Sequence, residues 1–302
     1  MNHIFVISNN LYRLEAFKKY YNIFGLPTVT KIHVILDDRY KDYDVSNIDD
    51  FFTIHYASDV LRSILPLLDE PTIAKNILDI YGVAIKWLVF PYVHKVLCIP
   101  KAMMMDDDVF LLAPLDHYFK YDYTYYNESA IGNMSTRVEK TMNVVYGDLV
   151  DIESLRRVPY WSINSGQLIH TENKHYMNFI NRAFSKDVYV LLYEGYMKYK
   201  NKPEYNRDGR SLGGKFWCIE QNVYTIYYRY LVNLGYQLKK YDSDVRLFRQ
   251  HLPENWTFKN LKTLPAYVHF VLKDKTQFYS QYAHELDKVM SGDYNIKPIN
   301  KY

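Results

Sequence analysis

Residues 103 to 112 read Met103-Met104-Met105-Asp106-Asp107-Asp108-Val109-Phe110-Leu111-Leu112, which is three adjacent carboxylates between two apolar runs. A short apolar run of this kind is typical of a buried strand. Strand side chains alternate between faces, so we expect Asp106 and Asp108 to emerge on the same side where the strand ends. Carboxylate oxygens suit hard divalent ions such as Mg²⁺ and Mn²⁺. The stretch predicts a cation site, and a plain polar turn after a core strand is the alternative.

The segments before this stretch alternate between two kinds of pattern. Short apolar runs typical of strands cover residues 4–7, 31–36, 51–56, 95–99 and 102–105, and helical spacing covers residues 11–24, 58–69 and 73–90. This alternation predicts an α/β fold with an open, mostly parallel central sheet flanked by helices, which binds ligands at the carboxyl ends of its strands. Asn9, Asp38 and the acid triplet each follow a predicted strand. We therefore expect these polar groups to converge on one rim of the sheet.

The composition is that of a globular chain with a sizeable core. The chain has 302 residues, of which 48% are apolar and 24% are charged, and these values exclude wholesale disorder. The net charge of +3 is mild, so composition alone does not predict a nucleic-acid-binding protein. Cys98 and Cys218 lie in apolar stretches without paired spacing, which predicts buried free thiols in a reducing compartment.

The N-terminus lacks the basic flank and the length of a signal peptide. The most apolar region, residues 83 to 99, is interrupted by Lys86, Pro91, His94 and Lys95, which argues against a transmembrane helix. These two features predict a cytoplasmic protein without membrane insertion.

Two later segments combine apolar runs with polar groups. Residues 161–169 predict a strand interrupted by Asn164-Ser165-Gly166, where glycine permits the close approach of a ligand, although a turn is the alternative. Residues 199–215 form a basic, glycine-containing segment, which we interpret as a lid over a charged substrate or as a plain surface loop. Its P-loop-like spacing is rejected because Phe216 stands where a hydroxyl is needed.

The last informative segments are a helix and a strand. Residues 217–234 predict a buried, aromatic-rich helix with Glu220-Gln221 in its first turns, and residues 265–271 predict a short strand that contains His269. A histidine in an apolar run is more often a satisfied core residue than a ligand.

In this order, the segments resemble the GT-A fold glycosyltransferases, and most closely the glycogenin-like and galactosyltransferase-like retaining branch. Four motifs carry the resemblance. The family's Asp-x-Asp after an apolar strand matches residues 106–108, and its Asn-Ala/Ser-Gly strand matches residues 164–166. An Asp-Gln pair that opens a helix is approximated by Glu220-Gln221, and a His-Phe strand with a lysine six positions on matches His269-Phe270 and Lys275.

The resemblance implies one Rossmann-like catalytic domain over residues 1–302, with a nucleotide-sugar-binding half at 1–120 and an acceptor half at 121–302. It implies that Asp106, Asp108 and His269 hold Mn²⁺ or Mg²⁺ against the diphosphate of a nucleotide-sugar. Residues expected to contact this co-substrate are Asn9, Arg13, Asp38, Lys86, Asn164, Ser165, Gly166, Lys273 and Lys275.

Three residues are expected to serve the chemistry itself. Asp107 would point away from the cation, to donor sugar hydroxyls or to inward structure. Glu220 and Gln221, with Asn164 and Gln167, would line the acceptor side. Glu220 is the best-placed candidate for a general base or a sugar-orienting carboxylate.

The function implied is metal-dependent transfer of a sugar from a UDP-sugar to an acceptor hydroxyl, with retention. The acceptor is left open between a glycan, a protein and a hydroxylated DNA base. A sugar-phosphate nucleotidyltransferase is an alternative, but Ser8-Asn9-Asn10-Leu11 does not supply the glycine-rich phosphate loop that it needs after the first strand. A non-catalytic GT-A-like module that binds a glycan is the other alternative.

Overall fold

The computed structural model describes residues 1–23, 30–111, 118–126, 135–157, 163, 165–200, 219–240, 245–248, 267–270, 284–285, 287–289 and 291–294. The chain forms two compact units, each assembled from segments that are far apart in the sequence. The first unit comprises Met1–Ile54, Met105–Lys120 and Tyr241–Tyr302, and the second comprises His55–Met104 and Tyr121–Lys240.

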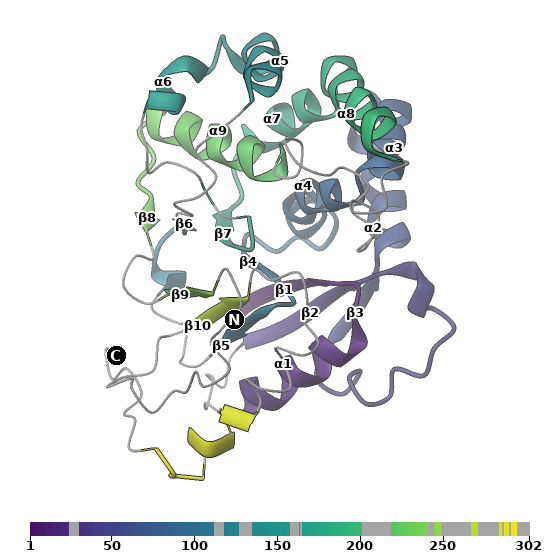
Figure 1. Ribbon diagram of the computed structural model, residues 1–302, viewed down its shortest axis with the longest axis vertical. Coiled ribbons are helices and arrows are strands. Elements are labelled where there is room, and N and C mark those ends of the chain that lie inside the picture. The colour runs from purple at the N-terminus through teal and green to yellow at the C-terminus, as the bar shows by residue number, and fades with distance from the viewer. Residues whose placement is uncertain are drawn as a thin grey trace. The chain divides into compact units, whose positions relative to one another are not determined.

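The described strands form two sheets (Figure 1). The larger sheet is mixed and has the order β3-β2-β1-β4-β7-β6-β8, and the smaller has the order β5-β10-β9. The bounds in the larger sheet are β1 Asn2–Ser8, β2 Thr30–Leu36, β3 Thr53–Tyr56, β4 Lys101–Asp106, β6 Tyr123–Tyr125, β7 Gln167–Thr171 and β8 Lys239–Lys240. Those in the smaller sheet are β5 Val109–Leu111, β9 Val245–Phe248 and β10 Tyr267–Phe270. The predicted α/β sheet is confirmed.

In the first unit, the strand, helix and strand predicted at the N-terminus are all present. β1 and β2 pair in parallel from Asn2 opposite Thr30 to Ser8 opposite Leu36, so their carboxyl ends lie at the same level. Helix α1 (Leu11–Ile23) lies against β1 and β5 and buries Leu14, Phe17 and Tyr21 at helical spacing. A short 3₁₀ turn, Asp38–Tyr40, follows β2.

The second unit is mostly helical among the described residues. Its helices are α2 Ala57–Ile64, α3 Pro71–Ile80, α4 Ile85–Pro91, α5 Thr136–Tyr146, α6 Ile152–Arg157, α7 Tyr176–Ala183, α8 Lys186–Tyr199 and α9 Ile219–Asn233. Helix α4 is buried throughout Trp87 to Pro91, and α9 is buried over most of its length, as predicted for this aromatic-rich segment. No helix in the described parts of the chain combines the length and apolarity needed to cross a bilayer.

The predicted helix over residues 73–90 is in fact two helices. Helix α3 ends at Ile80, and Tyr81 adopts φ −140° and ψ 71°, which are not helical angles. The chain then makes a 3₁₀ turn at Gly82–Ala84 before α4 begins. The predicted helix over 58–69 is similarly shortened, because α2 ends at Ile64 and a 3₁₀ turn containing Pro66 follows.

The prediction of an extended segment over residues 95–99 is wrong. Residues Tyr92–Val96 instead continue α4 as a π-helical turn, and the Leu97 amide donates to the Tyr92 carbonyl at 3.1 Å. Cys98 has φ 55° in the connection to β4. The prediction that Cys98 is buried is also wrong, because its side chain in this connection is exposed. Cys218 lies outside the described residues.

Buried histidines form a polar chain inside the second unit. His94 Nδ1 lies 2.6 Å from the carbonyl oxygen of Ile99, and His94 Nε2 lies 2.9 Å from His170 Nδ1. His170 Nε2 lies 2.9 Å from the Tyr227 hydroxyl. Because a carbonyl only accepts, His94 Nδ1 carries the proton, and every later member of the chain then donates toward His94. Asn173 donates in turn to the hydroxyl oxygens of Tyr227 and Tyr123.

This chain requires both imidazoles to be neutral. Burial lowers the pKa of His94, and it lowers the pKa of His170 well below its usual value. A second proton on His94 would set its Nε2–H against the Nδ1–H of His170. Burial also raises the pKa of Tyr123 to about 12, so this hydroxyl stays protonated near neutral pH.

We predict that the contribution of these two histidines to the free energy of unfolding does not change with pH above about pH 6.5 and decreases as the pH falls below that value. Below that pH the histidines bind protons in the unfolded chain but not in the folded chain. The free energy of unfolding therefore falls by about 1.4 kcal/mol per pH unit for each histidine. Urea unfolding at pH 7.5 and 5.5 measures this. A His94→Gln/His170→Gln variant should be less stable at pH 7.5 but should show a much smaller loss on acidification. An unchanged pH dependence in this variant would contradict the assignment.

Candidate functional site

The acid triplet lies where the predicted strand ends. Residues Ala102 to Met105 of β4 are fully buried, β4 ends at Asp106, and β5 begins at Val109. Asp107 and Asp108 form the turn between the two strands and are 7% and 4% exposed. The three carboxylates therefore lie together at the end of β4 and in the tight, buried turn that follows it.

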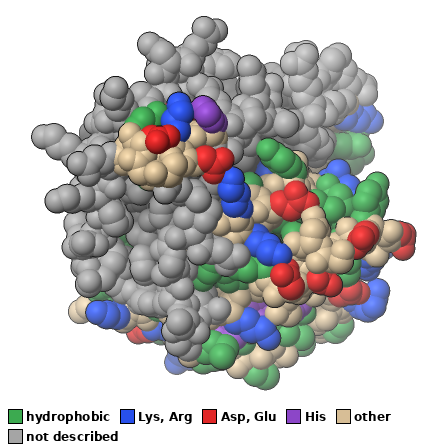
Figure 2. Space-filling view, turned by 90° about the horizontal axis from the view of Figure 1, so that it is seen from below, with side chains coloured by type: hydrophobic (Ala, Val, Ile, Leu, Met, Phe, Trp, Pro, Cys, Tyr) green, Lys and Arg blue, Asp and Glu red, His purple; other side chains and the backbone are tan. Residues whose placement is uncertain are grey.

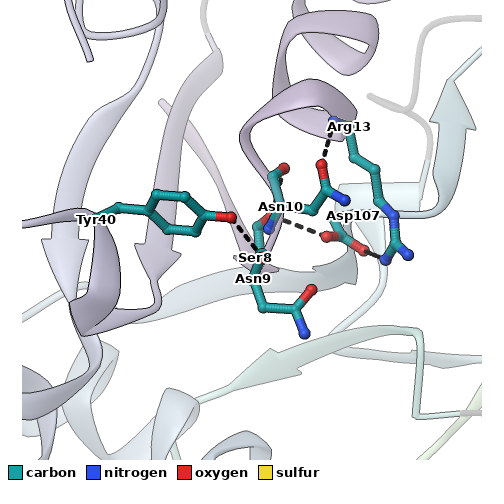
Figure 3. A network of polar contacts seen from close by, with 6 residues as sticks. All are labelled: Ser8, Asn9, Asn10, Arg13, Tyr40 and Asp107. Atoms are coloured by element: carbon teal, nitrogen blue, oxygen red, sulfur yellow. Dashed lines mark hydrogen bonds and ion pairs between the residues drawn. The ribbon is translucent and has the colours of Figure 1, made fainter. Parts of the chain in front are cut away.

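Asp107 is held from two neighbouring elements (Figure 3). The Ser8 hydroxyl at the end of β1 donates to Asp107 Oδ2 at 2.8 Å. Arg13 Nη1, in the first turn of α1, donates to Asp107 Oδ1 at 3.0 Å. Asp107 thus makes inward structural contacts, and the guanidinium that we expected to reach the donor is paired with it.

The loop between β1 and α1 is itself closed by hydrogen bonds. Asn10 Oδ1 accepts from the backbone N–H of Arg13 at 3.3 Å, in the manner of a helix N-cap. The backbone N–H of Asn10 donates to Ser8 Oγ at 3.0 Å. The helix therefore begins with a side-chain cap, and in the loop closed in this way both Ser8 and Arg13 contact the carboxylate of Asp107.

The remaining residues on this rim are more exposed. Asn9 is exposed, and its backbone carbonyl accepts from the Tyr40 hydroxyl at 3.1 Å (Figure 3). Asp38 pairs with Lys41 at 3.1 Å, and Asp37 caps the 3₁₀ turn by accepting from the Arg39 amide at 3.0 Å. Sequence analysis did not anticipate the contact of Tyr40 with Asn9, because the two residues lie far apart in the sequence.

The backbone of His269 lies next to the acid triplet. β10 is antiparallel to β5, and its register sets His269 opposite Val109, the residue that follows Asp108. Directly opposed residues in such a pair have Cα atoms about 4.5–5.5 Å apart. The His269 side chain lies outside the described residues. Among the side chains that are described, no three His, Cys, Asp or Glu residues gather as a cation cluster.

The residues present nevertheless fit a divalent cation. Asp106 and Asp108 supply hard oxygen donors from one turn, which is the ligand type that Mg²⁺ and Mn²⁺ prefer. The histidine expected as third ligand belongs to the adjacent strand.

Two expected donor-contacting residues meet in the second unit. Lys86 Nζ, near the start of α4, donates to Ser165 Oγ at 3.3 Å. Ser165 is fully buried, and Gly166 directly precedes β7. Asn164, Lys273 and Lys275 lie outside the described residues.

The expected acceptor-side residues are buried in the second unit. Glu220 is 5% exposed, and its Oε2 accepts from the Tyr81 hydroxyl. Gln221 Oε1 and both polar side-chain atoms of Gln167 are buried without a hydrogen-bond partner among the described residues. Such amides are costly in an apolar core, and substrate hydroxyl groups are suitable partners for them.

We predict that Tyr81→Phe lowers the free energy of unfolding by about 1–3 kcal/mol, because the buried carboxylate of Glu220 loses a donor. Tyr43→Phe is the matched control, since Tyr43 is 62% exposed and should shift stability by less than about 0.5 kcal/mol. Chemical denaturation of both variants tests this, and equal small effects would show that the Tyr81 hydroxyl contributes little.

The sequence matches no protein-family model and no curated protein. Mouse xyloside xylosyltransferase 1 is similar in structure over 91% of this chain and 98% of that chain, with a TM-score of 0.51 at 9% sequence identity. The galactosyltransferase LgtC aligns over 99% of this chain and 98% of its own, with a TM-score of 0.40 at 10% identity. A glycosyltransferase involved in glycosylation of the major capsid of PBCV-1 aligns over 93% and 98%, with a TM-score of 0.36 at 8% identity. The match to the xylosyltransferase, together with the observed strand order, shows that the chain has the GT-A glycosyltransferase fold.

Proposed function

We propose that this chain is a metal-dependent glycosyltransferase that moves a sugar from a UDP-sugar to an acceptor hydroxyl, with retention. The observation that carries the proposal is the acidic turn after β4, with His269 in register beside it, in a GT-A fold. Residues 1–120 would serve mainly the donor, and residues 121–302 would serve the acceptor and supply the histidine.

Asp106, Asp108 and His269 would hold Mn²⁺ or Mg²⁺. When bound, the cation supplies positive charge beside the diphosphate oxygens that become more negative as the bond from sugar to phosphate breaks. Lys273 and Lys275 would add positive charge for the same leaving group. The half-buried Asp106, at the end of β4, and the buried Asp108, in the turn that follows, would direct their oxygens to one ion.

Donor recognition would use the rim formed by the ends of β1 and β2. Asn9 and Asp38 follow these strands, which end at the same level, and would bind the base and ribose of the nucleotide. Arg13 would act at the same end of the unit, and its pairing with Asp107 fixes the position of its charge. Lys86, Asn164, Ser165 and Gly166 are also proposed as donor-contacting residues.

Acceptor chemistry would use the buried polar residues of α9 and β7. Glu220 would act as general base or would orient the sugar, with its carboxylate held by Tyr81. Gln221 and Gln167 would bind sugar hydroxyls through side-chain atoms that lack partners in the described part of the chain. Glu220 stands where the family motif has aspartate, so its carboxylate reaches one methylene further.

We propose a glycan or a protein, rather than DNA, as the acceptor. On the described part of the face in Figure 2, acidic and basic side chains are interspersed. Exposed ion pairs in the first unit include Lys18 with Asp50 and Lys19 with Asp287. Nucleic-acid-binding surfaces instead concentrate basic residues on one face.

We predict that the protein with Mn²⁺ releases nucleoside diphosphate from at least one sugar in a panel of nucleotide-sugars. Asp108→Ala should lower this rate by about 100-fold or more, because a ligand of the cation is lost. The control Asp50→Ala removes an exposed carboxylate, 67% accessible at its side chain, and should keep the rate. Chelation by EDTA should abolish the activity, and added Mn²⁺ should restore it. Equal rates in Asp108→Ala and the wild-type protein would exclude the proposed site.

We predict no salt-sensitive affinity for DNA. Fluorescence anisotropy with a labelled duplex at 50 and 200 mM salt tests this, because a protein that contacts several phosphates loses affinity steeply over that range. Tight binding at 50 mM that weakens at 200 mM would instead favour a hydroxylated DNA base as acceptor.

A further inference from the structure

We infer that Asp107 is a positioning residue, which through Arg13 and Ser8 fixes the acidic turn so that Asp106 and Asp108 face one divalent cation. The inference rests on the proposed function, since that function supplies the cation. It assigns to the middle carboxylate of the triplet a role that differs from the roles of its two neighbours.

The contacts of Asp107 show how the turn is held. One oxygen accepts from Ser8 at 2.8 Å and the other accepts from Arg13 at 3.0 Å. These partners belong to the end of β1 and the first turn of α1, so the turn is tied to two elements. The side chains of Arg13 and Asp107 are 18% and 8% exposed, so the contacts are largely shielded from water.

The partners of Asp107 are themselves fixed. Ser8 Oγ accepts from the Asn10 amide, and Asn10 Oδ1 accepts from the Arg13 amide. The loop is further closed where the Leu14 amide donates to the Asn10 carbonyl at 3.4 Å. A turn anchored to this loop has few ways to rotate, and a preorganised turn binds an ion without first being ordered.

The ion pair also sets the charge of the turn. Three adjacent carboxylates repel one another, and the guanidinium of Arg13 balances the middle one. The turn then presents two net negative charges, which match a divalent ion. Metal ligands in proteins are commonly oriented by such outer contacts, whose loss typically weakens metal affinity 10- to 100-fold.

Arg13 could affect the cation only through its charge, or it could act by fixing the turn, and these two models predict different results for one variant. Arg13→Gln removes a positive charge near the cation, so Coulomb attraction alone would tighten Mn²⁺ binding. If Arg13 fixes the turn, the same variant weakens binding. Asp107→Asn weakens binding under both views, so Arg13→Gln is the decisive variant.

The test is a titration with Mn²⁺ alone, in which free ion is measured by electron paramagnetic resonance. We expect the dissociation constant to rise about tenfold in Arg13→Gln and in Asp107→Asn, relative to the wild-type chain. Lys19→Gln is the matched control, because it removes one positive charge from the same helix in an exposed pair with Asp287, and it should bind as the wild type does.

Ser8→Ala provides a milder variant in case the others fail to fold. It removes one donor to Asp107 and should raise the dissociation constant about threefold, with circular dichroism confirming that the chain is folded.

Three outcomes would overturn the inference, and they separate it from the proposed function. Unchanged or tighter Mn²⁺ binding in folded Arg13→Gln would exclude positioning while leaving the transferase proposal intact. Wild-type affinity for Mn²⁺ in folded Ser8→Ala would exclude a positioning role for the Ser8 contact, again without affecting the transferase proposal. A wild-type chain that binds no Mn²⁺ would remove the cation site, and the proposed function with it.

Discussion

The ion pair between Arg13 and Asp107 is the constraint on which the first unit's polar rim depends. Asp107 is 7% exposed, and a carboxylate so deeply placed is stable in its charged form only if a cation or strong donors accompany it. Arg13 and Ser8 meet that requirement from two elements, and so the strand end, the helix start and the acidic turn have one mutual arrangement. The geometry of the neighbouring Asp106 and Asp108 follows from this arrangement.

One network inside the second unit satisfies buried polar groups without charge. Its buried polar groups, His94, His170 and Tyr227, satisfy one another in a chain whose direction is set by a single backbone carbonyl. Gln167 and Gln221 are the contrasting case, because their buried atoms have no partner within the described residues. The histidine network satisfies its own hydrogen bonds and stabilises the fold, whereas the two glutamine side chains are suited to bind a ligand.

Much of the fold was predictable, because periodicity reports burial. β1, α1, β2, β4 and α9 follow runs of apolar residues whose spacing matches the elements formed. The break at Tyr81 and the π-helical turn at Tyr92–Val96 were not predictable, since both lie inside apolar sequence where the pattern is the same for helix and strand. The acid triplet was evident from its residues. Its partners Ser8 and Arg13 were not, because they lie far away in the sequence and no local pattern encodes such contacts.

The register of β10 on β5 has a consequence for biosynthesis. Strand β5 is made early, but its antiparallel partner is the segment Tyr267–Phe270, near the end of the chain. A ribosome therefore synthesises the whole second unit before the smaller sheet of the first unit can close. Until residues 267–270 have been synthesised, β5, which follows the acidic turn, lacks its antiparallel partner. A chain cut short before that point would therefore lose the smaller sheet of the first unit although all segments of the second unit had been made.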